Sequence, residues 1–106
     1  MPSKYETLLL FSPDLTTEER QKVLDDLHQV IQRYSGEVLT VDDWGLKNLA
    51  YPVKKHNKGH YLRMEYAAPG NTVHELERRI RIAEGVLKFL TVKLQDSVQT
   101  TAQEAS

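Results

Sequence analysis

The spacing of hydrophobic residues switches four times between the alternation of a strand and the period of a helix, and the order of these switches restricts the fold most strongly. Residues 4–11 alternate and carry apolar residues on both faces towards their end, which is typical of a strand inside a sheet. Residues 16–34 follow a helical period, and Thr16 with Glu19 has the form of a capping box. Gly36 is expected to end this helix because glycine tolerates positive φ. One helix face gathers the apolar side chains Val23, Leu27, Val30, Ile31 and Tyr34.

A long extended segment follows over residues 37–53, and Gly45 interrupts its alternation as a bulge or a bend. Pro52 lacks an N–H group and therefore suits the end of a strand or the edge of a sheet. Residues 54–59 are expected to form a hairpin turn, after which the chain returns as a strand over residues 60–67.

A second, shorter helix is predicted after the loop at residues 68–71, where Thr72 and Glu75 again have the spacing of a capping box. Its apolar face consists of Val73, Leu76, Ile80 and Ala83. Gly85 ends this helix, and residues 86–94 are rich in β-branched and aromatic residues, which predicts the last strand.

The predicted element order is therefore β-α-β-β-α-β, within one domain over residues 1–95. Two right-handed crossovers and one hairpin give a four-stranded antiparallel sheet with both helices on one face. We expect an α+β chain of ferredoxin-like architecture, followed by a flexible polar tail at residues 96–106. The other face of the sheet stays uncovered, and such a face commonly meets RNA, another protein or a second copy.

The composition excludes several kinds of site. The chain contains no cysteine, which removes disulfides, thiol nucleophiles and cysteine-ligated metals. The apolar run at residues 8–11 is too short for a membrane span or for the core of a signal peptide, so we expect a soluble cytoplasmic protein. The sequence contains no phosphate-binding glycine loop, dinucleotide fingerprint or nucleophile elbow, and we therefore predict no catalytic residue.

The charges are divided unevenly along the chain although the formal net charge is only −1. Residues 1–43 contain four Lys/Arg and nine Asp/Glu, a net of −5, whereas residues 44–106 contain ten Lys/Arg and six Asp/Glu, a net of +4. Residues 44–63 contain no acidic residue, and this asymmetry points to an anionic partner on one side. The cations expected to contact phosphates are Lys47, Lys54, Lys55, Lys58 and Arg63, with Lys4, Arg79 and Lys93 as a second set.

Each of these features also has a simpler structural explanation. The basic hairpin can be a solvated turn, and the arginines of residues 78–81 can form a solvated helix face partnered by glutamates. Tyr61 and Tyr66 lie five residues apart and thus on opposite faces of a strand, so we expect them to pack rather than to stack on bases. The four histidines lack the spacing and the carboxylate support of a metal site, and we expect no metal.

The sequence of residues 45–54, Gly-Leu-Lys-Asn-Leu-Ala-Tyr-Pro-Val-Lys, resembles the signature of the bacterial small-subunit ribosomal protein six family. That family has a Gly-x-basic-polar-Leu-Ala-Tyr stretch, usually followed by Pro-Ile. The opening Lys-Tyr-Glu of residues 4–6 and the helix–strand junction over residues 79–94 are similar as well. Val53 replaces the more common isoleucine, and residues 83–85 lack the Asp or Asn that is frequent before the last strand.

The resemblance implies a structural component of the small ribosomal subunit without catalytic activity. Members of the family have the ferredoxin-like fold and bind the central domain of small-subunit ribosomal RNA as a pair with the small basic ribosomal protein eighteen. A nearly neutral member suits a basic partner, because the partner supplies phosphate neutralisation and the acidic first half attracts it. The expectation includes no cofactor, no membrane, no small-molecule substrate and a monomeric free form.

Two other functions fit the same architecture. An acyl-phosphate hydrolase needs an anion-binding loop with an arginine after the first strand, and residues 12–15 contain no arginine. A ligand-sensing or self-associating module would use the open sheet face, where Leu8 and Leu10 are expected to point away from the helices.

Overall fold

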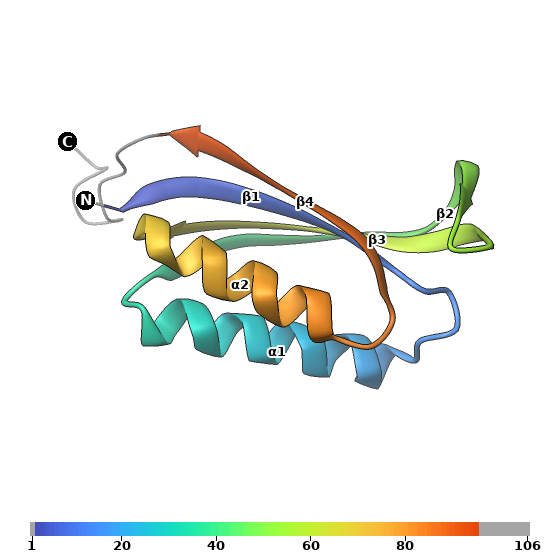
Figure 1. Ribbon diagram of the computed structural model, residues 1–106, viewed down its shortest axis with the longest axis horizontal. Helices are drawn as coiled ribbons and strands as arrows, with labels where there is room; N and C mark the ends of the chain where they lie inside the picture. Colours follow the sequence, from blue (N-terminus) through green and yellow to red (C-terminus); the bar gives the residue numbers. More distant parts are fainter. Residues whose placement is uncertain (1, 96–106) are drawn as a thin grey trace.

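The computed structural model describes residues 2–95 and confirms the predicted element order. The elements are β1 (Ser3–Phe11), α1 (Thr17–Arg33), β2 (Glu37–Val53), β3 (His56–Ala68), α2 (Gly70–Ile82) and β4 (Val86–Gln95). The strands form one antiparallel sheet in the order β2-β3-β1-β4, and both helices cover the same face of it (Figure 1). The predicted tail at residues 96–106 lies outside the described residues. Within the described part, neither helix has the length and apolar character needed to cross a bilayer.

The core fills the space between the sheet and the two helices. On β1 the alternate residues Tyr5, Leu9 and Phe11 are buried and face the helices. They belong to one cluster with buried side chains of both helices and of β3, which include Leu27, Val30, Ile31, Leu62, Met64, Tyr66, Leu76 and Ile80. Burial of each large apolar side chain contributes about 1.5–3 kcal/mol, so this layer is the main source of stability.

Thr7 brings a polar group into this layer without leaving it unpaired. Its Oγ1 is hydrogen-bonded to Tyr66 Oη at 2.9 Å and to Thr91 Oγ1 at 3.0 Å. The ring of Tyr66 also stacks on Tyr5, with 5.7 Å between the centroids. Burial raises the pKa of the Tyr66 phenol, which keeps it neutral in the core. Tyr66 thus packs inside the protein, as its spacing from Tyr61 predicted.

Hydrogen bonds fix the start of α1 as the sequence predicted. The N–H of Glu19 donates to Thr16 Oγ1 at 3.1 Å, and the N–H of Thr16 donates to Glu19 Oε1 at 2.8 Å. The two bonds form a complete capping box and satisfy two N–H groups that the helix itself leaves without acceptors.

The end of α1 differs from the prediction. Ser35, and not Gly36, adopts the positive φ, at 65°. The N–H of Ser35 donates to the Gln32 carbonyl and that of Gly36 to the Ile31 carbonyl, which closes the helix in a Schellman arrangement. Glycine is needed at position 36 for space, because a Cβ there would lie 2.8 Å from the carbonyl oxygen of Ala67.

The predicted capping box at the second helix does not form. α2 begins at Gly70, its N-cap is Pro69, and no side chain caps it. The extended backbone of Pro69, with its φ of −61° fixed by the ring, lets the helix start before Thr72. Thr72 therefore lies within the first turn, where its buried Oγ1 has no hydrogen-bond partner among the described residues.

The turn between β2 and β3 is shorter than predicted. Only Lys54 and Lys55 form it, rather than residues 54–59, and β3 begins at His56 instead of His60. Lys54 and Lys55 both have positive φ, at 48° and 70°, as in a two-residue type I′ turn. Gly45 has a φ of 78° beside a shift in the β2–β3 register, which confirms the predicted bulge.

Two neighbouring substitutions at the end of α1 should change stability in opposite directions. Ser35→Gly should raise the free energy of unfolding by about 1 kcal/mol because it relieves the left-handed backbone of a residue with a Cβ. Gly36→Ala should lower it by about 1–3 kcal/mol, since the new Cβ would also lie 2.9 Å from Ile31 Cγ2. Urea unfolding measures both changes, and an alanine variant as stable as the parent chain would contradict the close approach at position 36.

Candidate nucleic-acid interface

The hairpin of β2 and β3 extends beyond the rest of the sheet. β1 ends at Phe11, which pairs with His60, so residues 56–59 of β3 have no pairing partner on β1. The pairing of β2 with β3 continues there through Lys47 opposite Gly59 and then turns irregular, because four residues of β2 face one residue of β3. The result is a projecting tip that curls away from the sheet (Figure 1).

Four of the predicted phosphate-contacting residues gather on this projection. They are Lys47, Lys54, Lys55 and Lys58. Residues 47–59 contain no acidic side chain, and within residues 2–95 no carboxylate forms an ion pair with any of the four. All four are exposed, so their ammonium groups remain available to an anion.

Two of these lysines occupy strained backbone positions. The type I′ turn places both Lys54 and Lys55 at positive φ, where Asn-Gly is the favoured pair. Residues with a Cβ in this region cost about 1–3 kcal/mol each and are found most often at functional sites. The turn therefore presents two cations at its tip at a cost in folding free energy.

Arg63 lies elsewhere, at the centre of an ionic network on the open sheet face. Its guanidinium contacts Glu6 on β1, Glu65 on β3 and, at 3.0 Å from Nη1 to Oδ2, Asp42 on β2. Hydrogen bonds to Glu65 and Glu6 raise the pKa of Arg63 far above its usual value. Lys4 joins the network through Glu65 at 3.1 Å, and hydrogen bonds from Arg63 and Lys4 lower the pKa of Glu65. With three carboxylates and two cations, the network carries a net charge of −1.

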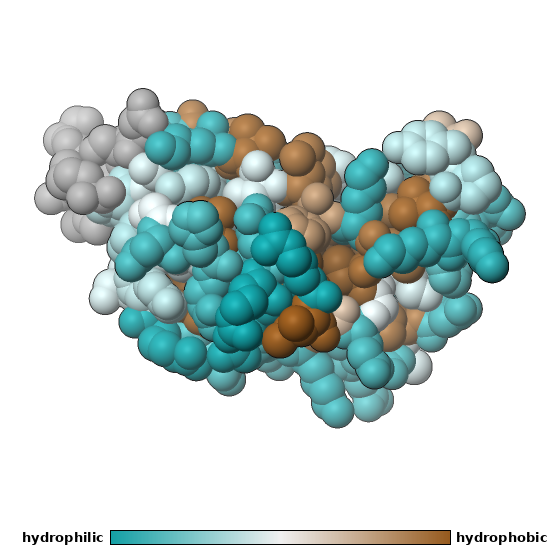
Figure 2. All heavy atoms as spheres, viewed as in Figure 1, coloured by the Kyte–Doolittle hydropathy of each residue, from teal (hydrophilic) through white to brown (hydrophobic). Residues whose placement is uncertain are grey.

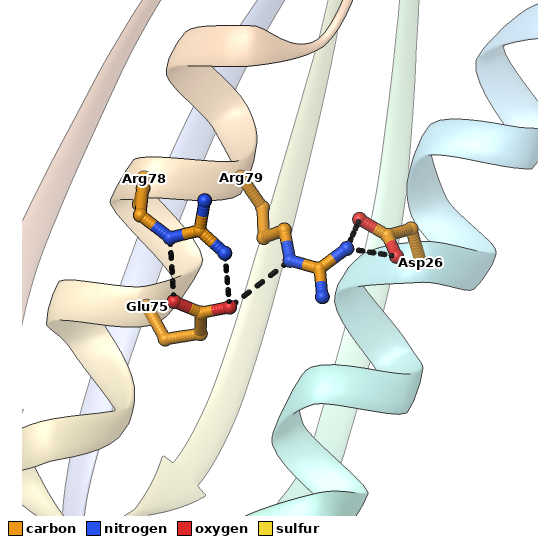
Figure 3. Close-up of polar contacts among 4 residues, drawn as sticks. All are labelled: Asp26, Glu75, Arg78 and Arg79. Carbon is orange, nitrogen blue, oxygen red and sulfur yellow. Dashed lines mark hydrogen bonds and ion pairs between the residues drawn. The ribbon is translucent and has the colours of Figure 1, made fainter.

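Arg79 connects the two helices. Its Nη1 lies 3.1 Å and 3.4 Å from the two carboxylate oxygens of Asp26 on α1, and its Nε lies 3.0 Å from Glu75 on α2 (Figure 3). Arg78 donates two hydrogen bonds of 2.8 Å to the carboxylate of the same Glu75. Together Arg78 and Arg79 lower the pKa of Glu75 to about 2.

The eight predicted cations thus fall into separate groups. Lys4 and Lys93 lie at the end of the sheet opposite the hairpin, since Lys93 pairs with Tyr5 on β1. Lys4, Arg63 and Arg79 already have carboxylate partners. The sequence indicated the helical pair of Arg79 with Glu75 but not the pairs that join different elements. The four hairpin lysines alone form a group on one projection.

Three residues near the hairpin, Trp44, Tyr51 and Lys88, were not among the predicted site residues. Lys88 on β4 donates a hydrogen bond of 3.3 Å to Tyr51 Oη and lies 5.8 Å from the centroid of the Tyr51 ring. Tyr51 is 60% exposed beside the lysines, and Trp44 is 46% exposed against Tyr61. Exposed aromatic rings next to cations can stack on unpaired bases. Trp44 and Tyr51 both lie in the acid-free segment, which was the one signal in the sequence that pointed to them.

Apolar side chains occupy another part of the open sheet face. Leu8 and Leu10 of β1, as predicted, lie outside the core cluster, and they line a hollow of about 150 Å³ together with Tyr61 and Leu90. On β4, Leu90, Val92 and Leu94 are exposed, and Figure 2 shows hydrophobic side chains along the edge that β4 forms. Among residues 2–95, no three histidine or carboxylate side chains converge as a metal site.

Comparison of the sequence with known proteins identifies one family. Residues 4–93 match the family described as Ribosomal protein S6. The small ribosomal subunit protein bS6 of Nitratidesulfovibrio vulgaris strain DP4 is 52% identical over 99 residues, which cover 93% of this chain and 98% of that protein. The bS6 protein of Lawsonia intracellularis is 45% identical, over 91% of this chain and 90% of its own.

The fold is also that of a solved member. The crystal structure of 30S ribosomal protein S6 from Thermotoga maritima superimposes with a TM-score of 0.81, over 99% of this chain and 94% of that one, at 22% sequence identity. That likeness supports the architecture, and the sequence matches over nearly the whole described chain establish the relationship. The chain belongs to the ribosomal protein S6 family.

Proposed function

We propose that this chain binds the central domain of small-subunit ribosomal RNA together with ribosomal protein eighteen, and that it has no catalytic role. Its family makes it a protein of the small ribosomal subunit, which in bacteria lies in the cytoplasm. What the family does not specify is how a chain of net charge −1 holds a polyanion.

The observation that carries the proposal is the group of lysines on the hairpin. Within the described chain, Lys47, Lys54, Lys55 and Lys58 lie on one projection without a carboxylate partner. Cations that neutralise phosphates release condensed counterions, which makes binding favourable and sensitive to salt. Tyr51, which lies beside them, adds a surface on which a base can stack.

The open sheet face suits the partner protein better than RNA. Its ionic network contains the carboxylates of Glu6, Asp42 and Glu65 and has a net charge of −1. Exposed apolar residues of β4 lie on the same face. A small basic protein can pair with the acids and cover the apolar side chains, whereas RNA phosphates would meet negative charge there. We propose that the free chain is a monomer that leaves this face for ribosomal protein eighteen.

Replacement of Lys54, Lys55 and Lys58 by alanine should weaken association with a central-domain RNA fragment in the presence of ribosomal protein eighteen. The slope of log K against log salt should become shallower by about 0.7–0.9 for each phosphate that the variant no longer neutralises. Filter binding across a series of KCl concentrations measures this slope.

A double variant, Lys22→Ala with Arg33→Ala, provides the control. Both residues are exposed on α1 rather than on the hairpin, so their replacement should leave the slope unchanged. If the salt slope falls by the same amount per removed cation in both variants, binding depends only on net charge. That result would contradict the proposal that the hairpin contacts the RNA.

Replacement of the two turn lysines by Asn-Gly, the pair that a type I′ turn favours, should raise stability and lower RNA affinity. Lys54→Asn with Lys55→Gly should raise the free energy of unfolding by about 1–2 kcal/mol because it relieves two residues at positive φ. The same variant should bind RNA less tightly and with a shallower salt dependence. A variant that is more stable yet binds RNA as the parent chain does would contradict a functional role for these two lysines.

The chain alone should bind the RNA fragment weakly, because its acids offset most of its cations. Addition of ribosomal protein eighteen should raise the affinity by supplying positive charge and by covering the open sheet face. Titration of the RNA with the chain, with and without the partner, measures the difference. Tight and sequence-specific binding by the isolated chain would contradict this proposal.

A further inference from the structure

A polar hollow lies where the hairpin tip, the end of α2 and the start of β4 meet. Its volume is about 270 Å³. Three of the residues that line it are cations, Lys54, Arg81 and Lys88, and the others are the apolar residues Ile80, Val86, Leu87 and Phe89. The hollow thus shares Lys54 with the hairpin and receives its other two cations from α2 and β4, where Arg81 and Lys88 were not among the predicted phosphate contacts.

Interactions with aromatic rings hold two of these cations in place. The guanidinium of Arg81 lies 5.5 Å from the centroid of the Phe89 ring, and the ammonium of Lys88 lies against Tyr51. Cation–π interactions of this kind fix a long side chain without neutralising its charge. The side chains of Arg81 and Lys88 therefore lose less conformational entropy when a ligand binds.

The charge around the hollow is not balanced by the protein. Within residues 2–95, the structure pairs only one carboxylate with these three cations, that of Glu77 at 3.6 Å from Arg81 Nη2. Three like charges around one concave surface repel each other and raise the local potential, which an anion relieves. The hollow lies at the C-terminal end of α2, where the helix dipole favours cations, so the side chains must supply the attraction for an anion.

We infer that this hollow binds a phosphate group of the RNA backbone, and that Arg81 and Lys88 are further RNA-binding residues. The inference rests on the proposed function, because it extends the RNA-binding surface from the hairpin lysines across Lys54 to β4. The hollow, with a volume of about 270 Å³, has room for a phosphate group. Guanidinium and ammonium groups form charge-assisted hydrogen bonds with phosphate oxygens.

The variants Arg81→Gln and Lys88→Gln test this site against the same RNA fragment and partner protein. Each should make the salt slope shallower by about 0.7–0.9, whereas Arg81→Lys and Lys88→Arg should keep it, because a cation remains. The matched control is Arg33→Gln on α1, which removes an exposed arginine at the other end of the molecule and should change nothing. Urea unfolding of every variant distinguishes weaker RNA binding from a destabilised fold.

A titration of the free chain with inorganic phosphate, at constant ionic strength, tests the hollow without RNA. The backbone amide signals of residues 54, 81 and 88 should shift in a saturable way in the parent chain and not in Lys88→Gln. If both glutamine variants bind RNA with the parent slope while the hairpin alanine variant does not, the inference is overturned and the proposed function stands. If the hairpin variant also keeps the parent slope, the proposed function falls, and a phosphate titration without saturable shifts then overturns the hollow as well.

Discussion

The antiparallel pairing of β2 with β3 beyond the last residue of β1 is the constraint on which the lysine-bearing tip of the hairpin depends. An isolated two-stranded ribbon has little stability of its own in water. Here the ribbon continues from a four-stranded sheet with a packed core, so its first residues are held by β1 and by the helices behind them. The rigid base lets the tip diverge from regular pairing, and the irregular stretch of β2 brings Tyr51 against Lys88 on β4.

The distribution of ion pairs explains how a protein of net charge −1 keeps a cationic end. Carboxylates of the sheet and the helices hold Arg63 and Arg79 at fixed positions, where these arginines join neighbouring elements. The lysines of the hairpin have no such partners in the described chain, because residues 44–63 contain no acid and no carboxylate elsewhere in residues 2–95 pairs with these lysines. Charges used for folding are thereby separated in space from charges that a ligand can use.

The sequence predicts features that are set by residues close together along the chain. It does not predict contacts between residues that are far apart in the sequence and meet only in the folded structure. The Thr16 capping box and the Gly45 bulge are local, and both were predicted correctly. The spacing of Thr72 and Glu75 suggested another local box, but Pro69 starts the helix earlier and two arginines bind Glu75. Some partners of the predicted cations lie on other elements more than fifty residues away, such as Glu6 for Arg63 and Asp26 for Arg79. No pattern of residue types along the chain encodes such pairings.

The strained turn between β2 and β3 connects stability with function. A type I′ turn between two strands is satisfied best by Asn-Gly, and selection for stability alone would favour that pair over Lys54-Lys55. Two adjacent lysines there also repel each other. Phosphates bound along the hairpin would offset both the backbone strain and the repulsion between the lysines. Each phosphate would form charge-assisted hydrogen bonds with the ammonium groups that the turn presents. Under the proposed function, the geometry that lowers the stability of the free protein also holds its two turn lysines where a polyanion would bind.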